Sequence, residues 1–208
     1  MSKESDYYRA NVPDEVNRRL IVNAAIAVKA AQIESRTFPD LERDAVSAFR
    51  RLNFLNALLY AVFPKGVTVK QEPHSGGTHV LIESGAVTIS TLTRSSMPYS
   101  HKLQPYQKTI AEDAQSKFQF VTGEQIPLAN DDAPTTRLYG LLIFGGDYRS
   151  RKLTLCRMTF PVADTGNFAP GTIDLLAKYP EAMAPFDDEE YATRVAMEWI
   201  EERRRRQA

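Results

Sequence analysis

Apolar residues recur every three or four positions over two long stretches near the start of the chain, and this spacing predicts two amphipathic helices. The first helix is expected over 13–35, because Pro13 suits a first turn and Asp14 and Glu15 suit the positive end of the helix dipole. The second is expected over 40–63 and ends before Pro64. The predicted apolar stripes are Val16, Leu20, Ala24, Ala27 and Ala31 in the first helix, and Leu41, Ala45, Ala48, Phe49, Leu52, Leu55, Leu59 and Phe63 in the second.

The rhythm changes near Gly66, where apolar and polar residues begin to alternate, and alternation is typical of strands. Three strands are expected over 66–92, with a tight turn at Ser84 and Gly85. Two more apolar runs, 138–144 and 153–160, predict a second hairpin. The sequence therefore predicts an antiparallel sheet of about five or more strands within 66–160.

The remaining segments complete an α+β fold. A short helix fits 108–117, a helical turn fits 173–177 within a loop over 161–186, and a last helix fits 187–206. Asp187 and Glu190 have the spacing of a capping box at the start of that helix. Its expected buried side is formed by Tyr191, Ala192, Val195, Ala196, Trp199 and Ile200. We expect a flexible N-terminus over 1–12, followed by a single domain over 13–208.

The arrangement follows from how these elements succeed one another. The short break between the first two helices predicts a helical hairpin over 13–63. No strand–helix–strand crossover is visible, which argues against a doubly wound nucleotide-binding fold. We therefore expect the helical hairpin and the C-terminal helix to cover one face of the sheet.

Composition narrows the classes of function. The 208 residues carry 26 basic and 26 acidic side chains, so a strongly basic nucleic-acid coat is excluded. Cys156 is the single cysteine, which rules out an internal disulfide and favours a reducing compartment. Neither an apolar leader nor a membrane-spanning run is present. We expect a cytoplasmic protein with no membrane partner.

Three histidines form the first candidate site. His74, His79 and His101 are close in sequence and could hold a divalent metal, with Glu72 or Glu83 as an oxygen ligand. Their spacing does not match a known zinc signature, and the simpler interpretation is a set of polar turn residues.

Basic side chains form the second candidate site. The segment just after the third predicted strand contains Arg94, Tyr99, His101 and Lys102, and Lys108 follows, so it could contact phosphates and stack a base. The run Arg203, Arg204, Arg205 and Arg206 could bind nucleic acid or an acidic partner. The simpler interpretations are a solvated loop and a run of cations that complements the end of a helix.

These residues favour a non-enzymatic binding or regulatory protein that acts on a protein or nucleic-acid partner and needs no cofactor. Self-association as a dimer is a further expectation. The alternative is a metal-dependent, nuclease-like hydrolase that uses the histidine cluster. The sequence assigns no catalytic residue and leaves open whether the protein is an enzyme. A small-molecule sensor with a pocket between sheet and helices is a third class, which the sequence does not address.

Overall fold

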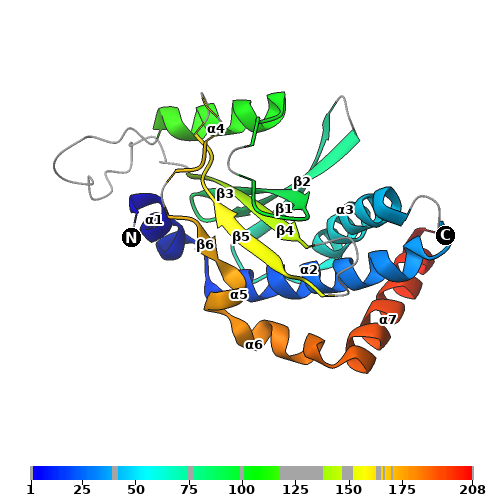
Figure 1. Ribbon diagram of the computed structural model, residues 1–208. Helices are drawn as coiled ribbons and strands as arrows, with labels where there is room; N and C mark the ends of the chain where they lie inside the picture. Colours follow the sequence, from blue (N-terminus) through cyan, green and yellow to red (C-terminus); the bar gives the residue numbers. More distant parts are fainter. Residues whose placement is uncertain are drawn as a thin grey trace.

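A six-stranded mixed sheet forms the centre of the molecule, with its strands in the order β1-β2-β3-β4-β5-β6 (Figure 1). The computed structural model describes residues 2–38, 42–74, 77–98, 101–117, 138–146, 152–162, 165, 167–169 and 171–207. The strands are β1 (Val67–His74), β2 (Gly77–Ser84), β3 (Val87–Arg94), β4 (Leu138–Gly145), β5 (Leu155–Thr159) and β6 (Ile173–Asp174). The predicted sheet is thereby confirmed and extended by β6, beyond the expected limit of 160.

One pairing differs from the predicted antiparallel arrangement. β3 and β4 are parallel, with Val87 opposite Leu138 and Arg94 opposite Gly145. Helix α4 (Pro105–Lys117) lies in the long connection between them. The prediction that no strand–helix–strand crossover exists was wrong, because proline residues and weak periodicity over 93–136 conceal this unit in the sequence.

Helices lie on both faces of the sheet: the helical hairpin covers one face, as expected, but a further helix covers the other. On one face, α2 (Asp14–Ser35) and α3 (Glu42–Tyr60) pack on each other and enclose the main core, which includes Ile82, Ile89 and Leu142. On the other face α4 lies over β4, where Ala111 packs against Tyr139 (Figure 1). The fold is nevertheless α+β, as predicted.

The two N-terminal helices bear out the predicted stripes to different degrees. All five stripe residues predicted for α2 are fully buried. In α3 the buried face instead includes Val46, Phe54 and Leu58, whereas Leu52 is 42% exposed. The predicted stripe of α3 was right in part, because Leu55, Leu59 and Phe63 pack against the core. It missed the buried Arg50 and Asn53, since polar residues carry no weight in an apolar pattern.

The first residues of the chain form a helix, α1 (Lys3–Asn11), where a flexible segment was expected. Ser2 caps this helix by accepting a hydrogen bond from the Ser5 backbone N–H. Tyr8 anchors it, because its ring is buried against Phe160 and its hydroxyl donates to Asn17 on α2 at 2.6 Å. These contacts are tertiary, which explains why the local sequence does not reveal the helix.

The C-terminal part runs through short helices into one long helix. These elements are α5 (Leu175–Lys178), α6 (Pro180–Met183), η2 (Ala184–Asp187) and α7 (Glu189–Gln207). Asp188, rather than the predicted Asp187, caps α7, since its side chain accepts from the backbone N–H groups of Glu190 and Tyr191. The buried face of α7 comprises Ala192, Ala196, Ile200 and Arg203.

Among the helices that the structure describes, none is both long enough and apolar enough to span a bilayer.

Candidate functional site

A cavity of about 420 Å³ lies beside the last four residues of β3, on the side where β2 leaves that strand. β1 and β2 pair along their whole length, but β2 pairs with β3 only from Ile82 to Ser84. The end of β3 is therefore bordered by a space, into which α3 and the start of α4 also face. The lining consists of Ser47, Arg51, Phe54, Leu55, His79, Thr91, Leu92, Thr93, Arg94, His101, Gln104, Gln107 and Phe144.

Helix α3 supplies one wall through residues spaced one and two turns apart. Ser47, Arg51 and Leu55 follow one another at intervals of four, so they share a face of the helix, and Phe54 lies beside them. Phe54 is fixed from behind, because its ring packs on Phe144 of β4 with 4.0 Å between the ring centroids. The wall is thus rigid at its apolar part, whereas Arg51 is exposed to solvent.

The start of α4 supplies the opposite wall and is built around Gln107. The Gln104 carbonyl accepts the first helical hydrogen bond from Lys108, and Pro105 occupies the first helical position. The buried Gln107 side chain reaches back and accepts from the Gln104 backbone N–H at 2.9 Å, as in a capping box. This bond assigns which end of the amide is the oxygen.

The same Gln107 oxygen lies 3.1 Å from Nε2 of His101. An amide oxygen only accepts, so Nε2 of His101 carries the proton and donates. Burial lowers the pKa of His101, and the nearby positive charge of Arg94 lowers it further, while the hydrogen bond to Gln107 acts in the opposite direction. His101 is therefore held neutral and in one orientation at neutral pH.

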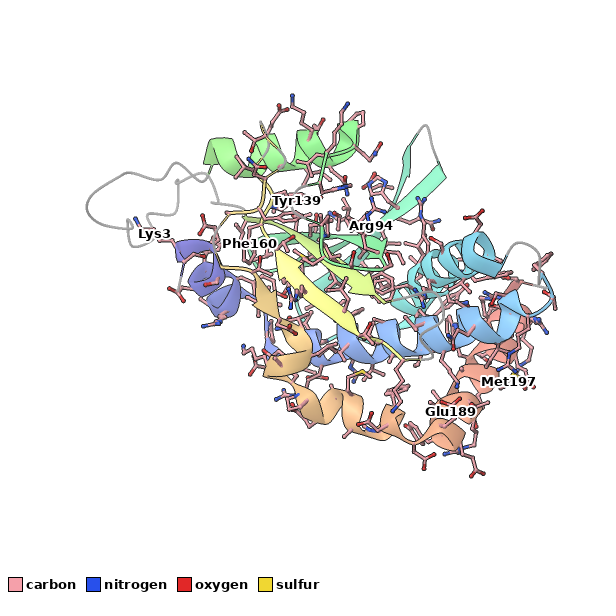
Figure 2. All side chains as sticks on the ribbon, in the orientation of Figure 1. Lys3, Arg94, Tyr139, Phe160, Glu189 and Met197 are labelled. Atoms are coloured by element: carbon pink, nitrogen blue, oxygen red, sulfur yellow. The ribbon has the colours of Figure 1, made fainter. Side chains whose placement is uncertain are left out.

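The backbone at Arg94 is fixed by the end of β4. Gly145 lies opposite Arg94 with a φ of +138°, and a Cβ there would lie 2.4 Å from the Arg94 carbonyl oxygen. The Gly146 N–H donates to that oxygen at 3.1 Å, and the Gly146 carbonyl accepts from buried Arg50 at 2.6 Å. Figure 2 shows Arg94 in the region between α3, α4 and the β1–β2 hairpin.

The electrostatic character of the cavity follows from its residue types. Arg51 and Arg94 carry permanent positive charges, and protonation of His101 would add another. None of the described residues that line the cavity is acidic. The start of α4 adds the positive end of a helix dipole, and the cavity lies at the carboxyl ends of two parallel strands, where open sheets commonly bind ligands. This arrangement suits an anionic group.

The structure brings together three of the predicted site residues and separates the others. Arg94, His79 and His101 line the same cavity. Lys102 and Lys108 are exposed and lie outside its lining, and Lys108 forms an ion pair with Glu112. Tyr99 and the side chain of His74 lie outside the described residues. Over the part that is described, no group of three or more His, Cys, Asp or Glu side chains gathers as metal ligands do, and the metal site stays a prediction.

The arginine run lies at the end of α7, away from α4 (Figure 1), and none of its residues lines the cavity. Arg203 is 5% exposed, and it forms an ion pair with Glu34 of α2 and donates to Asn53 of α3 at 2.7 Å. Asn53 also donates to Glu34 and accepts from the Trp199 indole N–H. We call Glu34, Asn53, Trp199 and Arg203 the helix clamp, because they join three helices.

The rest of the arginine run is on the surface. Arg205 and Arg206 both pair with Glu202, and Arg206 also lies over the Tyr60 ring at 4.5 Å from its centroid. A binding role for Arg204, Arg205 and Arg206 stays a prediction, whereas Arg203 is occupied inside the protein.

Sequence reasoning missed several cavity residues, chiefly Ser47, Arg51, Thr91, Thr93, Gln104 and Gln107. Two local patterns could have indicated some of them. Gln104-Pro105-x-Gln107 has the form of a helix start with a capping glutamine. Ser47 and Arg51 share a helix face with an interval of four. The approach of these missed residues to Arg94 depends on the parallel pairing of β3 with β4, which no local sequence pattern predicts.

Cys156 is excluded as an accessible nucleophile. It is a free thiol and fully buried on β5, and this burial raises its pKa well above the ordinary range. It therefore packs as a small apolar side chain.

No protein-family model matches this chain, and the comparisons with curated proteins and with solved structures likewise found no significant match.

Proposed function

We propose that this is a binding protein whose cavity between α3, the end of β3 and the start of α4 takes the phosphate group of a ligand. The observation that carries the proposal is the lining itself: Arg51 and Arg94 border one cavity together with two histidines, and none of the described lining residues is an acid that would neutralise the arginines. Arginine forms paired hydrogen bonds with phosphate oxygens, and a helix start favours anions.

Phosphate could reach the cavity on a small molecule or on a nucleic acid. The exposed Lys102 and Lys108 belong to the same segment and would contact the backbone of a longer strand. Regulation through a protein partner, self-association and a cytoplasmic location remain predictions from the sequence.

Isothermal titration with inorganic phosphate, pyrophosphate and sulfate tests the proposal. We expect saturable binding that weakens with added salt, because salt screens charges that solvent can reach. The double variant R51Q/R94Q should bind at least about tenfold more weakly, since one charge-assisted hydrogen bond contributes about 1.5–3 kcal/mol. R19Q is the matched control, because Arg19 is exposed on α2, pairs with Glu15 and lies outside the cavity.

Equal affinity in the wild type and the double variant, or an absence of binding to all three anions, would contradict the proposal. A parallel titration with short DNA and RNA separates the two sources of phosphate. Binding to strands that needs Lys102 and Lys108 as well as the arginines would identify a nucleic acid.

A metal-dependent hydrolase is the second proposal, and one observation supports it. His79 and His101 line the same cavity, as the metal hypothesis requires of two of its three imidazoles. Metal analysis of the purified protein and melting with and without a chelator test it. Stoichiometric metal whose removal lowers the melting temperature would favour the hydrolase, whereas metal-free protein with an unchanged melting curve would contradict it.

A further inference from the structure

The two elements that border the cavity, α3 and β3, run antiparallel to each other. Arg50 on α3 bonds to Gly146, just past the end of β4, and Phe54 packs on Phe144, one turn further along the helix. Gly145 and Phe144 lie opposite Arg94 and Thr93 of β3. Residues later in α3 therefore lie beside residues earlier in β3.

This antiparallel arrangement separates the two arginines of the cavity from an apolar part of its lining. Arg51 follows Arg50, so it lies at the Arg94 end, while Leu55 lies one turn on, about 5.4 Å along the helix axis. Phe54 lies beside Leu55 in the lining, and both pack against the main core. Leu55 is half-buried, so part of its side chain remains accessible.

Hydroxyl and amide side chains lie among these lining residues. Thr91 and Thr93 are half-buried on β3, and Gln104 is exposed at the start of α4. Each can both donate and accept hydrogen bonds. The cavity thus offers cations at one end, side chains that bind hydroxyl groups along its length, and an apolar surface about one helical turn from the cations.

We infer that the ligand is a nucleoside monophosphate, with its phosphate at Arg51 and Arg94, its ribose beside the threonines and Gln104, and its base against Leu55 beside Phe54. This inference rests on the proposed function and specifies it. A ribose supplies the separation between the anionic and apolar parts, and about 420 Å³ falls within the size range of small-molecule sites. A flat base would cover the apolar surface, which a sugar phosphate alone would leave uncovered.

Titration of the full chain with AMP, UMP, adenosine, ribose 5-phosphate and inorganic phosphate tests the inference. We expect AMP to bind at least about tenfold more tightly than ribose 5-phosphate, with the difference coming from the base. L55N, checked for folding by circular dichroism, should reduce this preference for AMP to about threefold or less. R94Q should weaken AMP and ribose 5-phosphate alike, and R19Q should change neither.

The outcomes separate the two proposals. If phosphate and ribose 5-phosphate bind and AMP and UMP bind no more tightly, the nucleotide inference is wrong and the phosphate site stands. If an oligonucleotide binds and no mononucleotide does, the inference is again wrong and a strand is the ligand. If no phosphate compound binds, both proposals fail.

Discussion

Arg203 in the helix clamp and Arg94 in the cavity both lie among polar side chains, but their surroundings differ in one respect. Arg203 faces the Glu34 carboxylate, which also accepts from Asn53, and both charges are almost completely buried. Arg94 is exposed at the end of β3, beside Arg51, His79 and His101, and no described residue of the cavity lining offers it a carboxylate.

This difference distinguishes a structural use of charge from a use in binding. A charge removed from water needs an opposite charge and hydrogen bonds inside the protein, and the helix clamp contains both. Arg51 and Arg94 border an open space whose described lining contains no acid, which leaves the neutralising role to a ligand. Both places hold arginine, so the neighbouring carboxylate is what separates them.

The largest effect is expected from breaking the helix clamp. R203M leaves Glu34 buried without its ion pair, which should lower the free energy of unfolding by about 3–5 kcal/mol in urea denaturation. R204M, on the exposed side of α7, should change it by less than about 0.5 kcal/mol. Phosphate affinity of folded R203M should equal that of the wild type.

The double variant E34L/R203M sharpens this test. It removes both charges and replaces them with apolar side chains, so it should recover much of the stability that R203M loses. A loss below about 1 kcal/mol in R203M, or no recovery in the double variant, would contradict the account of the clamp as an ion pair that needs both members.

A smaller effect is expected from the glycine that fixes Arg94. G145A places a methyl group 2.4 Å from the Arg94 carbonyl oxygen at a φ of +138°, so β3 and β4 must shift. We expect a loss of about 2–3 kcal/mol in stability and weaker phosphate binding. G66A is the control, because Gly66 also has a positive φ, +89°, but a Cβ there meets nothing within 4 Å.

G66A should cost only the backbone strain, about 1 kcal/mol, and leave phosphate binding unchanged. The contact with Arg94 is thus measured as the difference between the two variants. Equal losses of stability, with phosphate binding intact in both, would show that the position of Arg94 does not depend on Gly145.

The smallest effect is expected from acidification, and it should have opposite signs for stability and for binding. The pKa of His101 is lowered in the folded protein from an ordinary value of 6.5. Below pH 6.5 the unfolded chain therefore binds more protons, so unfolding of the free protein becomes easier as the pH falls, until the lower folded pKa is passed. Protonation adds a positive charge to the cavity, so anion affinity should rise over the same interval.

Sulfate is the suitable probe, since its own charge is constant between about pH 5 and 8, where histidine titrates. Denaturation and sulfate titration of the wild type and H101Q at several pH values measure both slopes. H101Q should show a weaker dependence on pH in each. Slopes identical to those of the wild type would exclude His101 as the group that titrates.

Much of the fold could be predicted from the sequence, because α2, the first three strands and α7 carry their own periodicity. The burial of Arg203 could also have been predicted, because it continues the helical spacing of Ala192, Ala196 and Ile200 and so lies on the buried face of α7. Its charge instead favoured a position on the surface. Leu52 is the opposite case, an apolar residue that α3 exposes while burying Arg50.

The cavity could be predicted only in fragments. Arg94, His79 and His101 stand out by residue type, but Arg51 lies on a helix more than 40 residues before Arg94. What joins them is the parallel pairing of β3 with β4 and the early departure of β2 from β3. Which strands pair, and over what length, depends on the whole chain, so a local sequence pattern does not predict it.

The helix clamp also sets the order in which the molecule can be completed. Glu34 and Arg203 are 169 residues apart in the chain, so the ribosome releases α2 and α3 long before their last partner exists. At a synthesis rate of about 5–20 residues per second, Arg203 is added roughly ten to thirty seconds after Glu34, so the ion pair cannot form in that interval. The final packing of α2 and α3 is therefore a late step, because it cannot precede the synthesis of α7.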